Sequence, residues 1–244
     1  MVSVDRGRKR MTRCADGGCA DGKRDLSARV RAVLRILQKS YPDAGTALRF
    51  NTPFQLLCAT ILSAQCTDAR VNIVTPVLFS RYPDARTLAV ARQADVERII
   101  HSTGFFRAKA RHLIGCSKAL VAYHAGQVPK DMASLVALPG VGRKTANVVL
   151  WNAFGMAWGI AVDTHVQRIT RLLGWTRRAS AERIEQDLMR LVPNEHWGDM
   201  THWLIAHGRA VCIAGRPRCD ACQVEKHCPG SRKGIITIKT GKNF

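Results

Sequence analysis

The chain has 244 residues, of which 46% are apolar, so it is long enough for one large or two small domains with a hydrophobic core. It carries 38 Lys and Arg against 18 Asp and Glu, a formal net charge of +20. Such a charge attracts polyanions, and it favours nucleic acid over anionic membrane because no amphipathic anchor or lipidation motif is visible. No apolar run follows the first charges, so we expect a soluble, cytoplasmic, nucleoid-associated monomer with no membrane contact.

In chain order, residues 1–24 predict a flexible basic tail, because they hold several Lys and Arg and lack apolar periodicity. From Leu26 onward, apolar residues recur every three or four positions, which predicts a first helix over about 25–45. The last residues, 231–244, predict a second basic tail. Further helical stripes, separated by Gly and Pro, follow the first helix at about 53–63, 68–80, 94–101, 106–124, 132–138, 143–154, 164–173, 181–191 and 196–212.

These stripes predict an all-α fold of about ten helices, because no pair of segments shows the alternation of a half-buried strand. The stretch 145–162 carries no charge but is interrupted by Gly and Asn, so a buried helix followed by a turn fits it better than a membrane span.

The most informative stretch is Leu-Pro-Gly-Val-Gly-Arg-Lys-Thr-Ala at 138–146, between a short and a longer predicted helix. Two glycines allow a tight turn and a close approach of the backbone to a large ligand. The N–H groups of the second helix then point outward and suit a phosphate, whatever the base sequence. Val141, between the glycines, would anchor the turn in the core. A bare Gly-x-Gly is equally compatible with an ordinary turn between helices.

Lys144 falls in the first turn of the second predicted helix. An amine is a nucleophile only when neutral, and an ordinary lysine has a pKa near 10.4. A helix N-terminus, basic surroundings and partial burial all favour the neutral amine. The residue is therefore a candidate nucleophile, and a phosphate-contacting surface lysine is the alternative.

With its flanks, the segment 138–146 resembles the helix-hairpin-helix DNA glycosylases, and the endonuclease III family in particular; the resemblance extends over about residues 25–230. It implies that Lys144 attacks C1′ of a damaged nucleotide, displaces the base, forms a Schiff base and lets β-elimination cut the strand. It also implies DNA contacts from the hairpin residues Gly140, Val141, Gly142, Arg143 and Thr145.

Asp163 precedes another helical stripe, where an aspartate is a good N-cap. The segment Val-Asp-Thr-His-Val at 162–166 also resembles the catalytic aspartate segment of this family. A carboxylate there would help to deprotonate Lys144 or stabilise positive charge on the sugar. We expect His165 to position groups or contact DNA rather than act as acid or base.

Four cysteines at 212, 219, 222 and 228 can enclose one metal centre. Zinc is the default for an arbitrary four-cysteine loop. The spacing of Cys212, Cys219, Cys222 and Cys228 resembles the [4Fe–4S] loop of the family, which implies a structural iron–sulfur cluster. Arg216 and Arg218 in this loop would offer cations to DNA phosphates. We interpret the nearby His196, His202 and His207 as ordinary polar-surface or DNA-facing residues.

Two loops are candidates for base eversion, which requires a wedge in the duplex. Leu-Ser-Ala-Gln-Cys-Thr-Asp at 62–68 resembles the family segment in which Gln65 inserts opposite the lesion and Ser63 contacts DNA. Gly-Phe-Phe-Arg at 104–107 aligns with the second wedge loop. We expect an aliphatic–tyrosine pair there, so the Phe105 wedge is a departure that puts the lesion range in doubt.

The resemblance implies two helical lobes, 46–156 and 25–45 plus 157–230, with double-stranded DNA that contains damaged bases or abasic sites lying across the cleft. We expect Lys144 and Asp163 to face each other there. The function implied is a glycosylase and abasic-site lyase for oxidised or ring-saturated pyrimidines. The alternatives are a monofunctional adenine glycosylase, which usually lacks the lysine, and a non-catalytic iron–sulfur DNA-binding protein.

Overall fold

The computed structural model describes residues 17–231, and over this range it contains helices and irregular segments but no strand. The all-α prediction is therefore confirmed. None of the helices described is long and apolar enough to cross a bilayer. The α-helices are α1 (Gly17–Ser40), α2 (Pro53–Leu62), α3 (Asp68–Arg81), α4 (Ala85–Ala89), α5 (Gln93–Ile100), α6 (Phe106–His124), α7 (Met132–Val136), α8 (Arg143–Phe154), α9 (Thr164–Leu172), α10 (Ala181–Leu191) and α11 (Trp197–Ala210).

Four short 3-10 turns complete the described elements, at η1 (His101–Thr103), η2 (Asn194–His196), η3 (Cys219–Ala221) and η4 (Glu225–His227). The turns η3 and η4 lie in the cysteine loop, and η1 directly precedes the Phe105 loop. The proposed metal site and the proposed Phe105 wedge both lie in or beside these short turns.

The N-terminal helix differs from its prediction, because it begins at Gly17 and ends at Ser40 rather than covering about 25–45. Residues 17–24 were placed in the flexible tail because they carry no apolar stripe, and periodicity cannot detect a helical turn of that kind. Helix α4 was also missed, since five residues are too few to show a period; a capping box between Asp84 and Thr87 starts it. Residues 1–16 and the predicted C-terminal tail from 232 onward lie outside the described residues.

Short polar side chains mark the starts of several helices. Thr52, Thr67, Asp163 and Ser180 each accept a hydrogen bond from the backbone N–H three residues on, at α2, α3, α9 and α10 respectively. Gly155 ends α8 in the left-handed region, with φ of 67°. These caps explain why the observed boundaries of α2, α3, α8, α9 and α10 fall within a residue or two of those read from the sequence.

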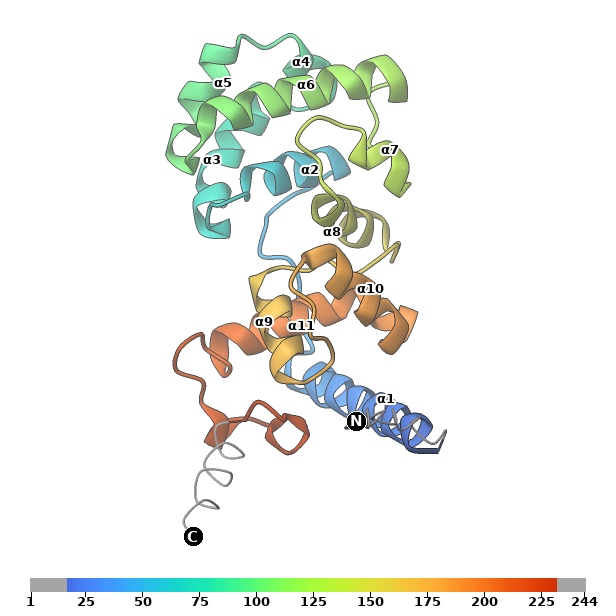
Figure 1. Ribbon diagram of the computed structural model, residues 1–244. Coiled ribbons are helices and arrows are strands. Elements are labelled where there is room, and N and C mark those ends of the chain that lie inside the picture. The colour runs from blue at the N-terminus through green and yellow to red at the C-terminus, as the bar shows by residue number, and fades with distance from the viewer. Residues whose placement is uncertain (1–16, 232–244) are drawn as a thin grey trace, which may run out of the picture.

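The helices form two lobes, seen as the upper and lower halves of Figure 1. One apolar core lies among α2–α8 and runs from Leu48 to Leu150. The other joins α1 to α9–α11 and runs from Val30 to Val224. The predicted divisions near residues 45 and 156 stay a proposal, which these two separate cores support.

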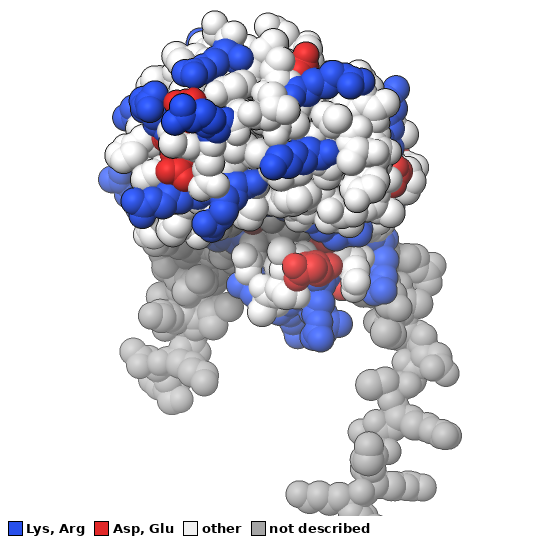
Figure 2. Space-filling model, turned by 90° about the horizontal axis from the view of Figure 1, so that it is seen from above, with Lys and Arg blue, Asp and Glu red and all other residues white. Residues whose placement is uncertain are grey.

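The first lobe carries much of the positive charge on its outer surface. Figure 2 looks down on this lobe and shows many Lys and Arg side chains with few acidic ones between them. Within this lobe, Asp95 in the first turn of α5 forms ion pairs with Arg81, Arg92 and Arg98. A single carboxylate among three guanidinium groups leaves the neighbourhood positive, as expected for a protein that approaches a polyanion.

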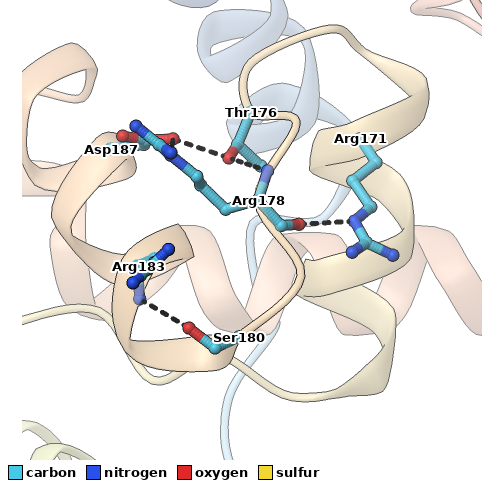
Figure 3. Close-up of polar contacts among 6 residues, drawn as sticks. All are labelled: Arg171, Thr176, Arg178, Ser180, Arg183 and Asp187. Carbon is cyan, nitrogen blue, oxygen red and sulfur yellow. Dashed lines mark hydrogen bonds and ion pairs between the residues drawn. The ribbon is translucent and has the colours of Figure 1, made fainter.

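The connection between α9 and α10 is held by polar contacts, drawn in Figure 3. Thr176 Oγ1 donates to Asp187 Oδ2 at 2.7 Å and also accepts from the Arg178 backbone N–H at 3.1 Å. Arg171 Nε donates to the Arg178 carbonyl at 2.8 Å. These bonds fix the loop that returns the chain from α9 to α10.

Candidate active site

The hairpin between α7 and α8 is built as a rigid turn. Val141 is buried in the core of the first lobe, as expected. Gly140 has φ of +79°, and a Cβ added there would lie 2.7 Å from His112 Cβ, so only glycine fits. Gly142 is the N-cap of α8 and supplies no side-chain cap to the first turn. The N–H groups of that turn are therefore presented to an external acceptor such as a phosphate.

Lys144 and Thr145 follow in the first turn of α8. The side chain of Lys144 is exposed and that of Thr145 is half-buried. The partial burial that would favour a neutral amine is therefore not provided by the free protein at Lys144. It has to come from a ligand that covers the residue.

Arg143 is engaged by the protein itself. Its Nε donates to Glu185 Oε2 of α10 at 2.6 Å, and this bond raises the pKa of Arg143. Glu185 is buried and also accepts from Asn147 Nδ2 at 2.8 Å. One carboxylate of the second lobe thus holds the first two turns of the helix that carries Lys144. Arg143 was predicted as a DNA contact; that role stays a prediction, and the observed contact is this link between lobes.

Asp163 caps α9 as the sequence indicated. Its Oδ1 accepts from the Val166 backbone N–H at 2.8 Å, which fixes the carboxylate at the helix N-terminus. His165 is half-buried and packs against Gly208 of α11. Burial lowers the pKa of His165, against the opposing influence of Asp163. The DNA contact predicted for His165 stays untested, and its ring lies against a neighbouring helix.

Lys144 and Asp163 come from different lobes and line the same cavity, whose volume is about 470 Å³. The α2–α3 connection supplies a second wall with Ser63 and Gln65, joined by Asp68 at the start of α3. Cavities of roughly 300–1,000 Å³ accommodate small ligands. The fold thus assembles a ligand-sized cavity around the proposed nucleophile and the proposed carboxylate.

Helix α11 supplies a third wall that the sequence did not reveal. Thr201, His202 and Arg209 line the cavity, and Arg209 Nη2 binds Asp68 Oδ2 at 3.1 Å across the lobes. His202 Nε2 lies 3.1 Å from Asn152 Oδ1, and burial lowers the pKa of this histidine. His202 and His207 were predicted to lie on the polar surface or to face DNA; both are buried, and His202 lines this cavity. Their positions on a helix with apolar neighbours were the available signal for burial.

The two predicted wedge loops share an unusual backbone. Gln65 and Phe105 have φ of 50° and 46°, and Ala125 is the other non-glycine residue with positive φ in the described chain. Such conformations cost of order 1–3 kcal/mol and cluster at functional sites. The Phe105 side chain is 69% exposed, which leaves an aromatic ring available for stacking. Ser63 is half-buried, and its Oγ donates to the Thr60 carbonyl at 2.8 Å.

The four cysteines lie around one cavity of about 320 Å³ at the tip of the second lobe. Four thiols and a cavity between them match the donor set of a centre larger than a single ion. Within residues 17–231, no three His, Cys, Asp or Glu side chains converge closely enough to hold one ion. Arg168 Nη1 donates to Cys212 Sγ at 3.3 Å. Arg216 and Arg218 are exposed in this loop, as a DNA contact requires.

Comparisons with known proteins agree with this geometry. Residues 58–194 match the family model of the HhH-GPD superfamily base excision DNA repair proteins. The chain is 52% identical to endonuclease III of Synechocystis sp. over 84% of its own length and 93% of that protein. It is 44% identical to endonuclease III of Escherichia coli, over 82% and 95% of the two lengths.

The solved structures of similar fold include a non-covalent endonuclease III–DNA complex and a trapped endonuclease III–DNA covalent intermediate. Each has a TM-score of 0.81 and 40% identity, and covers 86% of this chain and 98% of its own. With relatives this similar over nearly their whole length, the chain belongs to the endonuclease III family of the HhH-GPD superfamily of base excision DNA repair proteins.

Proposed function

We propose that this protein removes oxidised or ring-saturated pyrimidines from double-stranded DNA and then cleaves the strand at the resulting abasic site. The observation that carries the proposal is the cavity of about 470 Å³, which is lined by Lys144 from one lobe and Asp163 from the other. A cavity of this size accommodates a nucleotide that has been turned out of the duplex. Both residues come from one chain, so a monomer suffices for the reaction. Its DNA substrate would place the protein at the nucleoid.

The proposed chemistry begins at the Lys144 amine. Its lone pair attacks C1′ of the everted nucleotide, and the bond from C1′ to the base breaks, so that the base leaves with the electron pair and takes up a proton. Opening of the C1′–O4′ bond then gives an iminium between Nζ and C1′. Removal of a C2′ proton expels the 3′ phosphate, which cuts the strand by β-elimination.

Asp163 has two roles in this scheme. Before attack, its carboxylate accepts the proton that keeps Lys144 cationic; during attack, its negative charge stabilises the positive charge developing on the sugar. The hydrogen bond from Val166 to Oδ1 holds the carboxylate at the cavity. DNA that covers the exposed Lys144 would supply the burial that favours a neutral amine.

DNA binding follows from the surfaces around the cavity. The hairpin at Gly140 and Gly142 presents backbone N–H groups to a phosphate, and Arg216 and Arg218 add cations. Gln65 and Phe105 would enter the duplex on either side of the everted nucleotide. The solved endonuclease III–DNA complex, whose protein chain is 40% identical to this one, supports DNA as the ligand.

The cysteine loop would hold a [4Fe–4S] cluster through Cys212, Cys219, Cys222 and Cys228, as the family resemblance implies and as the shared cavity allows. When bound, such a cluster cross-links a loop that has little apolar core of its own. The chain's own contribution is to hold this loop, with Arg216 and Arg218, at the edge of the DNA surface.

Borohydride trapping tests the proposal. Wild-type protein incubated with a duplex that carries a ring-saturated pyrimidine should form a covalent adduct, and Lys144→Gln should form none. Asp163→Asn should slow adduct formation by about 10²–10⁴-fold. Lys118→Gln is the matched control, because Lys118 is exposed on α6 away from the cavity, and it should trap as the wild type does.

Other outcomes would overturn the proposal in identifiable ways. Full trapping by Lys144→Gln would assign the nucleophile to another residue. Base release without strand cleavage would indicate a monofunctional glycosylase, for example one for adenine. Damage-independent DNA binding with no product would indicate a non-catalytic DNA-binding protein.

A further inference from the structure

A buried lysine lies beneath the Phe105 loop, where the proposed chemistry has no use for an amine. Lys109 is only 4% exposed, although it belongs to the first turns of α6 on a strongly basic protein. Lysine is almost never fully buried without a partner, because an ammonium loses its hydration there. This side chain therefore calls for a structural reason.

The ammonium is tied to the backbone of the loop. Lys109 Nζ donates to the Thr103 carbonyl at 2.7 Å, while the Lys109 backbone N–H donates to the Phe105 carbonyl at 3.0 Å. Thr103 Oγ1 in turn donates to the Ile100 carbonyl at 2.8 Å. These hydrogen bonds close residues 103–109 into a compact loop. The exposed aromatic side chain of Phe105 lies at the tip of this loop.

The closed segment explains how a strained residue is held. Phe105 has φ of 46° and acts as N-cap of α6 with no side-chain cap of its own. A non-glycine residue persists in the left-handed region only when its surroundings over-determine the conformation. The Lys109–Thr103 bond is such a constraint, because it fixes the chain on the N-terminal side of Phe105 to the helix on its C-terminal side.

The other wedge loop lies near the same amine. Burial lowers the pKa of Lys109, and the nearby Cys66 thiol acts in the opposite direction. Cys66 follows Gln65 directly, and its backbone N–H closes the turn to the Ser63 carbonyl at 3.1 Å. The Lys109 ammonium thus lies near the loop that carries Gln65, while its hydrogen bond goes to Thr103 in the segment that carries Phe105.

We propose that Lys109 is a positioning residue that holds the Phe105 loop, next to the Gln65 loop, in the conformation that wedges a DNA duplex open. This inference rests on the proposed function. Lys109 touches neither the reacting sugar nor Lys144 in this scheme, and it acts through the loops alone. Its contribution is therefore confined to duplex substrates, whose stacked bases the wedge has to separate.

The test compares one abasic site in two contexts, in duplex DNA and in the same strand without its complement. Single-turnover strand cleavage and borohydride trapping are measured with the full-length, cluster-loaded protein. Lys109→Met should slow the duplex reaction by about tenfold or more, as expected for loss of a buried charge-assisted hydrogen bond. Its rate on the single strand should match that of the wild type, because there is no stacked duplex for the wedge to enter.

Two further variants make the comparison specific. Lys109→Arg keeps a cationic donor and should recover part of the duplex rate. Lys118→Met removes an exposed lysine from the same helix and should leave both rates unchanged. A 2-aminopurine next to the abasic site reports unstacking directly, and its fluorescence rise on binding should be lost with Lys109→Met and kept with Lys118→Met.

The outcomes separate this inference from the proposal beneath it. Equal losses on duplex and single strand would show a general structural role for Lys109, and unchanged rates on both would show no role; either result overturns the inference. Normal single-strand cleavage also shows that the variant has folded around its active site. If the wild type cleaves neither substrate, the proposed function itself fails, and this inference fails with it.

Discussion

The two lobes are stabilised in different ways. The first lobe closes a continuous apolar core with consecutive helices, α2 to α8. The second lobe is assembled from segments far apart in the sequence, and of the cysteine loop at 212–231 only Val224 among its apolar residues is buried. Apolar burial suffices for the first lobe, whereas the loop of the second lobe depends on what its four thiols hold.

The largest expected effect is therefore in the cysteine loop. Cys219→Ser should abolish the visible absorbance of the proposed cluster and remove hydrogen-exchange protection over 212–231, because a ligand is lost from a loop with little core. Protection in α2–α8 should be unchanged. Cys66→Ser, which alters a half-buried cysteine outside the loop, should keep the absorbance. Unchanged absorbance in Cys219→Ser would contradict the claim that the cysteine loop, unlike the first lobe, depends on a centre bound by its thiols.

In the first lobe, the matching test is a single glycine of the hairpin. Gly140→Ala forces φ of +79° on an alanine and sets its Cβ 2.7 Å from His112 Cβ, so the free energy of unfolding should fall by about 2 kcal/mol. Gly142→Ala has open space and φ of −91°, and should change stability by less than about 1 kcal/mol. Urea unfolding measures both. Equal effects would show that the turn is not tightly packed.

The link between the lobes predicts a smaller change. Glu185→Gln removes the ion pair with Arg143, and unfolding should become easier by about 1–2 kcal/mol, a value reduced because Arg143 is about half exposed. Arg98→Gln removes an exposed partner of Asp95 and should cost within about 0.5 kcal/mol. Denaturant titration of both variants decides. If Glu185→Gln lowers the free energy of unfolding no more than Arg98→Gln does, the Arg143–Glu185 ion pair does not stabilise the contact between the lobes.

The smallest effect concerns His202, in the α11 wall of the cavity. Burial lowers its pKa in the folded state, so below the ordinary histidine value of about 6.5 the unfolded chain binds the proton more readily. This contribution to stability is fully present above that pH and is lost as the pH falls. His202→Gln should show a weaker loss of stability between pH 7.5 and 5.5. Identical pH profiles would mean that another group causes the dependence.

What the sequence predicted well was local. The hairpin at 138–146, the cap at Asp163 and most helix boundaries depend on residues within a few positions of one another, and their periods and caps were readable. The start of α1 and the short α4 carry no apolar period, so pattern analysis missed them.

What the sequence did not reveal depends on distant partners. Arg143 was predicted only as a DNA contact, and its ion-pair partner Glu185 lies 42 residues away. The Asp68–Arg209 pair spans 141 residues. His202 was predicted as a polar-surface or DNA-facing residue, and its burial depends on how α11 packs against α8. The role of Lys109 was equally hidden, since only the fold shows that its amine turns back to Thr103.

Peptide mapping of the borohydride-trapped complex tests the central claim most directly. We predict that the DNA remnant is bonded to Lys144 Nζ, in the peptide that begins α8, and that Lys144→Gln yields no such peptide. A remnant on any other residue would contradict the assignment of the nucleophile. So would the failure of any damaged duplex to give a covalent complex.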